Sequence, residues 1–444
     1  MTPDRREYHQ QLLPKLRASL ADNTQPIRVK KRSVSNLFRY DGRGQTAAKQ
    51  IDLRAFNKPL HVDLEAKTLE VQGLATFKHI VDFTLPYGLA PFVTPELKHI
   101  TVGGAIVGIG IETNSFRYGF VHDSLLEAEV LLPGGDIVIC TPTNHHADLF
   151  RGLANSYGTL GYILRAKLKL RPVQPFVELT TSRYTTTKSL VTAMHQAALS
   201  PKTDYLESLI YSKNELYLTT GKEVAKAKNR LSIYGQTIFY RHISRVGTIR
   251  LPIKEYLFRY DPEWFWALPE TSSYCAFRGL APRFVRNSSF YTRYVAFTKS
   301  LGKKEQPDHL EKLIQDWEVP WQYSTELLDF ALNHLALEGK PLLAAPTKTL
   351  SKNSLYPLPP GELYFNLGSY HFVKRQLHHP PYYHTKIMDE FCFNHKGIKM
   401  LYSSSFLSER NFYQKYGGPA YNKLKAKYDP KGLAPTLYQK AVQS

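Results

Sequence analysis

The sequence has little cysteine, no long hydrophobic run and too few acidic residues to balance its bases. Only three cysteines, Cys140, Cys275 and Cys392, occur in 444 residues, and their wide spacing indicates neither a disulfide framework nor a zinc ribbon. No segment approaches the ~20 apolar residues of a membrane-spanning helix, and the charged N-terminus lacks the apolar core of a signal peptide. We therefore expect a cytoplasmic chain without a signal peptide or a transmembrane helix.

The shortage of acids leaves a formal charge of +20, from 58 Lys and Arg against 38 Asp and Glu. These bases are spread along the chain instead of clustering beside a nucleic-acid-binding motif, so we expect no nucleic-acid partner. The densest basic and aromatic stretch, 278–293 (RGLAPRFVRNSSFYTR), is typical of a segment that contacts an anionic membrane surface. An ordinary solvated face is the alternative for this stretch.

Histidine pairs occur at 145–146 and 378–379. Adjacent residues of a strand point to opposite faces, which argues against joint ligation of a metal by either pair. The neighbouring sequence does not complete a ligand set with carboxylates or thiolates at metal spacing. We therefore expect no metal site.

Small residues are concentrated in two segments, 101–118 (TVGGAIVGIGIETNSFRY) and 156–161 (SYGTLG). Because glycine has no Cβ, such backbones can approach a large ligand closely. The spacing is not that of a Rossmann dinucleotide site, since Thr113 stands where the third glycine after Gly108 and Gly110 would be, and no strand-loop-helix pattern surrounds the run. From these residues alone, a ligand-binding segment and a structural turn are both open.

The sequence around these glycines resembles the 24-dehydrocholesterol reductase (diminuto) branch of the vanillyl-alcohol-oxidase flavoprotein superfamily. The similar blocks occur in order and cover roughly residues 26–440, which is more specific than a single glycine run. The principal blocks are 95–113 (PELKHITVGGAIVGIGIET), 127–136 (EAEVLLPGGD), 158–161 (GTLG), 204–212 (DYLESLIYS), 253–266 (IKEYLFRYDPEWFW), 362–368 (ELYFNLG) and 399–402 (KMLY).

This resemblance implies an α+β fold of the vanillyl-alcohol-oxidase, or PCMH, type, in which FAD lies between two α+β subdomains beside an antiparallel-sheet cap for the substrate. We expect the FAD-binding domain at 1–175, the substrate-binding cap at 176–395, and a C-terminal segment at 396–444 that returns to the FAD-binding domain. A chain of this length exceeds one comfortable core, which agrees with two domains. Amphipathic patterns in the expected cap, at Thr187–Leu199 and Pro307–Trp317, predict helices there.

The resemblance also assigns the flavin contacts to the two small-residue segments, where loop N–H groups would hold the pyrophosphate. The expected FAD-binding residues are Thr101, Val102, Gly103, Gly104, Ala105, Gly108, Gly110, Ile111, Glu112, Thr113, Tyr118, Gly158, Thr159, Gly161 and Ile163. Some members of the superfamily attach FAD through a histidine near the N-terminus, but the corresponding region, 39–44 (RYDGRG), has none. We therefore expect non-covalent FAD.

The activity implied by the resemblance is that of an FAD-dependent oxidoreductase acting on CH–CH groups. NADPH would pass hydride through flavin N5 to a C=C bond of a sterol or isoprenoid lipid, while a protein acid supplies the proton. Glu207, Tyr402 and Tyr260 are the candidate catalytic residues, because apolar neighbours would raise a carboxyl pKa or shield a phenol; a structural hydrogen bond is their alternative role. The expected pocket residues are Arg259, Trp264, Tyr364 and His371.

Two other functions stay open. One is an FAD-dependent oxidase or dehydrogenase of an alcohol or a lipid-linked sugar, similar to the decaprenylphosphoryl-ribose oxidases. The other is a non-catalytic, basic, membrane-associated protein, which would lack the yellow colour of a flavin. The expected cap is more similar to the reductase branch than to the oxidases.

Overall fold

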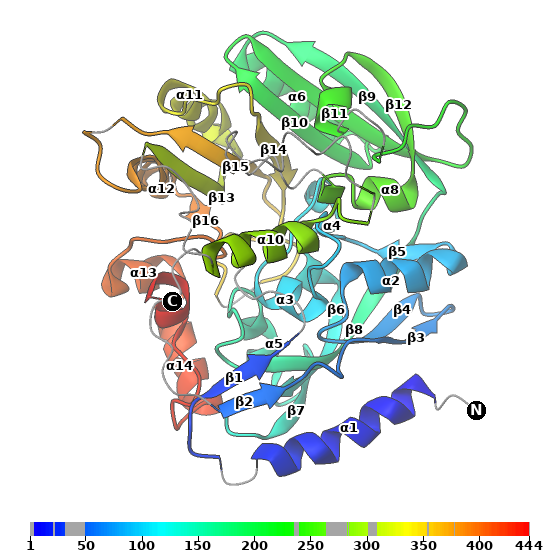
Figure 1. The fold of residues 1–444 in the computed structure, drawn as a ribbon, viewed down its shortest axis with the longest axis vertical. Helices are drawn as coiled ribbons and strands as arrows, with labels where there is room; N and C mark the ends of the chain where they lie inside the picture. Colours follow the sequence, from blue (N-terminus) through cyan, green and yellow to red (C-terminus); the bar gives the residue numbers. More distant parts are fainter. Residues whose placement is uncertain are drawn as a thin grey trace.

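The computed structural model describes residues 4–20, 23–31, 49–234, 239–262, 282, 284–300, 309–352, 355–376 and 378–443. Two large sheets lie one above the other along the long axis, each with its own helices (Figure 1). The mixture of helices with antiparallel sheets confirms the expected α+β class. Cys140 and Cys392 are buried free thiols, and Cys275 lies outside the described residues.

The first sheet is built from the N-terminal part of the chain and has the strand order β3-β4-β8-β6-β7, with β5 paired to β8. Its strands are antiparallel: β3 Pro59–Asp63, β4 Thr68–Gln72, β5 Leu89–Pro91, β6 Leu125–Leu131, β7 Ile137–Cys140 and β8 Tyr162–Pro172. A parallel pair, β1 (Ile27–Lys30) and β2 (Lys49–Asp52), lies beside helix α1 (Arg5–Leu20). The remaining helices of this part are α2 (Phe77–Thr84), α3 (Val102–Val107), α4 (Ser115–Tyr118) and α5 (Ala147–Leu153).

Helix α3 differs from the expected glycine loop. Thr101 begins the helix, and its hydroxyl accepts a hydrogen bond from the Gly104 N–H (3.3 Å). Such an N-cap satisfies one of the donors that a helix start leaves unpaired, so this short glycine-containing segment forms a helix in spite of its low intrinsic propensity.

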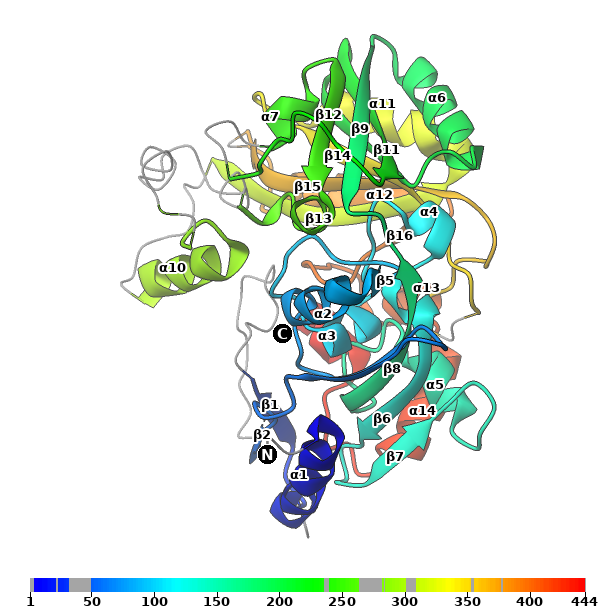
Figure 2. The same cartoon turned by 90° about the vertical axis from the view of Figure 1, so that its right-hand side faces the viewer.

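The second sheet has eight strands in the order β12-β9-β11-β10-β14-β15-β13-β16. These strands are β9 Phe176–Tyr184, β10 Tyr205–Ser212, β11 Glu215–Val224, β12 Gly247–Pro252, β13 Leu310–Pro320, β14 Leu342–Thr347, β15 Tyr364–Lys374 and β16 Ile398–Lys399. Helices α6 (Thr187–Leu199), α11 (Ser324–His334) and α12 (Tyr383–Asn394) pack on one face through a shared apolar core (Figure 2). The other face turns toward the first sheet and shares its core.

The expected helix at Pro307–Trp317 is wrong, because Leu310–Pro320 is strand β13, which lies between β15 and the edge strand β16 of the second sheet. Leu313 and Trp317 face the helices, while Ile314 belongs to the core shared with the first sheet. A strand that is buried on both faces does not alternate apolar and polar residues. Apolar residues on both faces of β13 together gave a sequence pattern similar to that of an amphipathic helix. Thr187–Leu199 is helical as predicted.

The C-terminal helices α13 (Glu409–Lys415) and α14 (Gly418–Tyr428) leave the cap sheet after β16 and pack beside α5. Lys427 Nζ forms an ion pair with Asp148 (2.7 Å), and the Tyr421 hydroxyl donates to Thr159 Oγ1 (3.1 Å). Three further helices of the described residues occur among the strands of the second sheet. The short helix α7 (Phe239–Ile243) precedes β12, and the short helix α8 (Ile253–Leu257) and the longer α10 (Ser288–Ser300) follow it, before β13. Within the described ranges, no helix has both the length and the apolar character needed to cross a membrane.

Candidate active site

The two small-residue segments lie against each other in the structure. The backbone N–H of Tyr157 donates to the carbonyl of Val107 (3.0 Å), and the Tyr157 hydroxyl donates to the carbonyl of Gly108 (3.3 Å). Segments that are about fifty residues apart in sequence therefore form one surface at the C-terminal end of α3.

Some of the predicted flavin-contact glycines are required by the packing of the protein itself. A Cβ at Gly103 would lie 2.8 Å from the carbonyl oxygen of Gly73, and one at Gly110 would lie 2.8 Å from Val121 Cγ2. At Gly161, whose φ is +152°, a Cβ would meet the Leu131 carbonyl oxygen at 2.8 Å. Side chains do not fit at these three positions, whether or not a ligand is present.

Other glycines leave the backbone accessible. Gly104 is exposed and Gly108 half-buried, and since they are four residues apart they lie on the same side of α3. A Cβ at Gly108 would also lie 2.8 Å from the carbonyl oxygen of Gly104, so this position combines accessibility with close packing. Gly158, also half-buried, has a φ of +78° and borders this surface through its neighbour Tyr157. Nearby, the buried hydroxyl of Ser156 has no hydrogen-bond partner among the described residues. A backbone surface without side chains beside an unpaired hydroxyl fits a large planar group such as a flavin.

Some of the remaining predicted FAD-binding residues are buried in the protein core, and others are partly accessible to a ligand. Val102, Ala105 and Ile163 are buried in the core of the first domain, and Thr159 is buried against Ser156 and Tyr421. Ile111, Glu112 and Tyr118 are half-buried. Region 39–44, considered for covalent attachment, lies outside the described residues.

The best-defined polar contact between the parts of the chain that contain the two sheets is centred on Arg259, which follows α8 and is fully buried. Its guanidinium binds Glu112 Oε2 at 2.9 Å, beside α3, and Glu207 Oε1 at 3.1 Å, on cap strand β10. The Tyr260 hydroxyl donates to Glu207 Oε2 (2.7 Å). The rings of Tyr256 and Tyr260 lie 4.6 Å and 4.9 Å from the guanidinium carbon, within range of a cation–π contact.

Two backbone and hydroxyl contacts strengthen this connection. The Leu206 N–H on β10 donates to the Thr113 carbonyl (2.9 Å), and the hydroxyls of Thr113 and Tyr256 are 3.0 Å apart. Thr113 is thus a predicted flavin-segment residue that contacts the cap. The Arg259 cluster, defined as Glu112, Glu207, Tyr256, Arg259 and Tyr260, joins the second sheet to the end of the predicted flavin-binding segment.

A second polar cluster surrounds Asp316 on the same face of the cap sheet. The Tyr370 hydroxyl donates to its two carboxyl oxygens at 2.9 Å and 2.8 Å, and the Tyr402 hydroxyl donates to Oδ2 at 2.5 Å. Burial raises the pKa of Asp316, and these tyrosine hydrogen bonds partly oppose the increase. Burial beside Asp316 raises the pKa of Tyr402 well above its ordinary value. The hydroxyl of Tyr402 is therefore held in a hydrogen bond to the carboxyl group of Asp316.

Glu96 lies in electrostatic contact with both clusters. The charges of Glu112, Glu207 and Arg259 on one side, and of Asp316 on the other, all influence its carboxyl group. Burial, followed by the charge of Glu112, holds the pKa of Glu96 well above its ordinary value. Glu96 is half-buried, five residues before the N-cap of α3.

The predicted pocket residues do not all lie in the region between the two sheets. Arg259 belongs to the interdomain cluster, and Tyr364 lies on the face of β15 that shares a core with the first domain. His371 lies on the opposite face of β15, where Phe365 and Val373 pack against the helices. Burial there lowers its pKa to about 3, so we omit His371 from the proposed site. Trp264 lies outside the described residues.

The sequence interpretation missed Glu96, Asp316 and Tyr370. Glu96 was within a recognised block, but nothing in its spacing distinguished it from a surface acid. Asp316 had been assigned to an amphipathic helix, where an acidic residue on the solvent face is ordinary. The available signal was the apolar surroundings of Asp316 and Glu318 in 313–319 (LIQDWEV), since buried acids need partners. Within the described ranges, no group of three or more His, Cys, Asp or Glu residues is arranged to hold a metal.

Comparison with known proteins agrees with this architecture. Residues 20–141 match a family described as an FAD binding domain. Δ24-sterol reductase of Macaca fascicularis is 27% identical over 410 residues, which cover 87% of this chain and 76% of the relative. Δ24-sterol reductase of Arabidopsis thaliana is 26% identical, with 88% and 76% covered.

A more distant similarity is confined to part of the chain. Cytokinin dehydrogenase 9 of Oryza sativa subsp. japonica is 29% identical over 143 residues, which cover 32% of this chain and 27% of the relative. The FAD-binding part is thus shared more widely, whereas the similarity to the sterol reductases continues through the cap. The predicted resemblance is confirmed, because this chain contains a match to the FAD binding domain family and is similar to the Δ24-sterol reductases over most of its length.

Proposed function

We propose that this protein reduces a C=C bond of a sterol or isoprenoid lipid, with non-covalent FAD as its cofactor and NADPH as its reductant. The similarity to Δ24-sterol reductases through the cap supports this substrate class. The single structural observation that carries the proposal is the Arg259 cluster, because it joins the flavin-binding segment to the cap through buried acids. Reduction of an alkene requires a proton donor near the cofactor, and this contact places acidic residues where the flavin-binding segment meets the cap.

The flavin, when bound, supplies hydride from N5. In the overall reaction NADPH and one proton are consumed, two C–H bonds form on the former alkene, and NADP⁺ leaves. We assign the binding of the flavin to the accessible backbone of Gly104, Gly108 and Gly158. Arg259 is a positioning residue, since its guanidinium holds Glu112 and Glu207 in fixed places.

The visible spectrum of the purified protein tests this function. We expect flavin bands that bleach under anaerobic NADPH and return when an alkene-bearing sterol such as desmosterol is added. Bands that NADPH leaves unchanged but an alcohol bleaches would instead establish an oxidase or dehydrogenase. A colourless protein that takes up no added FAD would contradict both enzyme functions.

We further propose that the segment 284–297 contacts an anionic membrane surface from the cytoplasmic side, where a lipid substrate would be available. Phe284 and Phe297 are 80% and 61% exposed, Arg293 is exposed between them, and α10 stands out from the body in Figure 2. Exposed aromatics beside bases are typical of interfacial binding. The basic net charge of the chain supports attraction to anionic lipid.

Sedimentation with vesicles tests the membrane contact. Wild-type protein should sediment with phosphatidylserine-containing vesicles and much less with phosphatidylcholine vesicles. The double variant Phe284→Ser/Phe297→Ser should lose several-fold of this binding. Leu199→Ser, at an apolar residue that is 70% exposed at the end of α6, is the matched control and should bind like the wild type. Equal binding by both variants would contradict the proposed surface.

A further inference from the structure

Glu96 differs from the other acids of the interdomain region in having no bonding partner. Glu112 and Glu207 bind Arg259, and Asp316 accepts hydrogen bonds from Tyr370 and Tyr402. Among the described residues, no hydrogen bond or ion pair reaches the carboxyl group of Glu96. Its position is nevertheless half-buried, so its carboxyl group is available to a molecule that enters between the domains.

The surrounding charges do not favour ionisation of Glu96. Among the described residues that influence its carboxyl group most strongly, Arg259 is the one base, and this guanidinium is already shared by Glu112 and Glu207. The neighbouring Lys98 is paired with Asp261 at 2.9 Å. Charges of three acids, Glu112, Glu207 and Asp316, disfavour a fourth negative charge. A proton on Glu96 removes this repulsion.

Glu318 lies on the same face of β13 as Asp316 and is also buried. Its hydrogen bonds distinguish it from Glu96. Burial raises the pKa of Glu318 to about 7. However, its carboxyl oxygens accept hydrogen bonds from the hydroxyls of Thr347 and Tyr356. Both oxygens are therefore occupied by the protein, and Glu318 is a structural acid. Glu96 combines a raised pKa with a carboxyl group that no described side chain or backbone group occupies, and proton donation to a ligand requires both.

We propose that Glu96 is the general acid that protonates the alkene, an inference that rests on the proposed reductase function. The π electrons of the C=C bond form a new C–H bond with the proton of Glu96, which becomes a carboxylate. The adjacent carbon receives the hydride that originates from NADPH, and Glu96 regains a proton from solvent. Glu207, Tyr260 and Tyr402, the residues considered from sequence, then act as positioning residues because their polar atoms are engaged with other side chains.

The protonation state of Glu96 can be tested in the flavin-free protein. An acid whose pKa is raised on folding keeps its proton in the folded state after the unfolded chain has lost it. Folding stability therefore falls as pH rises from the unfolded pKa, near 4.5, until the folded pKa is reached. Glu96→Gln removes this penalty, so the variant should gain stability relative to wild type as pH rises above the unfolded pKa.

The flavin-free comparison needs urea titrations across this pH range and a control. Glu65→Gln, at an exposed residue in the turn between β3 and β4, should give a curve parallel to the wild type. A Glu96→Gln curve that is also parallel to the wild type would show that Glu96 is ionised like an ordinary surface acid, and would overturn the inference.

A single-turnover measurement tests the role in chemistry. Protein with bound FAD is reduced by dithionite, so that the result does not depend on NADPH, and is then mixed anaerobically with the sterol alkene. Glu96→Gln should slow reoxidation of the flavin by ~10²-fold or more, while FAD affinity and reduction by NADPH stay at the wild-type level. Glu65→Gln should reoxidise at the wild-type rate.

The outcomes separate this inference from the function on which it rests. If the alkene does not reoxidise the wild-type flavin, the proposed reductase function fails. If the wild type is reoxidised and Glu96→Gln is equally fast, the function stands and Glu96 is not the acid. A slow Glu96→Gln step that still declines at high pH like the wild type would also overturn the assignment, because loss of the acid should remove that decline.

Discussion

The flavin-binding segment and the cap face opposite it are built in different ways. The segment 101–118 is continuous in sequence, and its character comes from backbone that side chains leave uncovered. The cap face instead brings single side chains together from β10, β13, β15 and the turn after α8. A backbone surface leaves a sequence motif, whereas scattered side chains leave none. This difference explains why the sequence indicates a cofactor segment but does not single out the side chains that meet on the second sheet.

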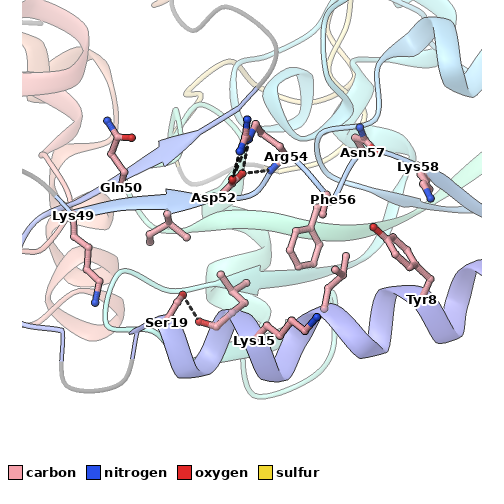
Figure 3. A pocket seen from close by; sticks show the side chains of 14 residues that line it. Tyr8, Lys15, Ser19, Lys49, Gln50, Asp52, Arg54, Phe56, Asn57 and Lys58 are labelled. Carbon is pink, nitrogen blue, oxygen red and sulfur yellow. Dashed lines mark hydrogen bonds and ion pairs between the residues drawn. The ribbon is translucent and has the colours of Figure 1, made fainter.

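A third region, between α1 and β2, contains a cavity but no side-chain arrangement that indicates a binding site. A cavity of about 870 Å³ lies between α1 and β2, lined by Lys15, Lys49, Arg54, Tyr8 and Phe56 among others (Figure 3). Arg54 is already paired with Asp52 at 2.5 Å. Flexible surface lysines do not by themselves make a binding site, so we assign this cavity no function.

The largest effect should come from breaking the contact between the two regions. Arg259→Ala leaves the half-buried Glu112 and the buried Glu207 without their shared base, which should destabilise the protein by ~3–5 kcal/mol. Urea unfolding measures this loss. Arg250→Ala, which breaks a partly exposed pair with Glu178 at 2.6 Å, is the control and should cost about 1 kcal/mol or less. Equal losses in the two variants would show that the Arg259 cluster does not hold the domains together.

A somewhat smaller effect concerns the pH dependence of the cap. Because the folded pKa of Glu318 is raised to about 7 from 4.5, its folded state retains a proton that the unfolded chain has released. Stability should therefore fall by about 3 kcal/mol as pH rises from ~4.5 to ~7, and then level off. Glu318→Gln should flatten this part of the stability curve, as measured by urea titration at several pH values. An unchanged slope in the variant would refute a protonated Glu318.

The smallest effect separates two neighbouring glycines of the flavin-binding segment. Gly103→Ala places a Cβ against the backbone of Gly73, so it should reduce stability by ~1–3 kcal/mol. Gly104→Ala meets only the Thr101 hydroxyl, and should cost less stability but weaken FAD binding. Thermal unfolding of flavin-free protein and FAD titration give the two quantities. The assignment of the α3 surface to flavin would fail if Gly104→Ala bound FAD as tightly as the wild type.

The sequence by itself determined the resemblance to the Δ24-sterol reductases, the α+β class and the two segments that come together at the end of α3. These depend on local features, since glycines, caps and ordered blocks keep their meaning without knowledge of the fold. The tertiary structure alone decided which glycines are accessible, because the close contacts of Gly103 and Gly161 involve residues distant in sequence. It also decided that β13 is a strand, and it placed Asp316 beside Tyr402 and Glu96 among three other acids. The burial of a residue and the electrostatic field at its side chain depend on all of its neighbours in space, and folding alone brings those neighbours together.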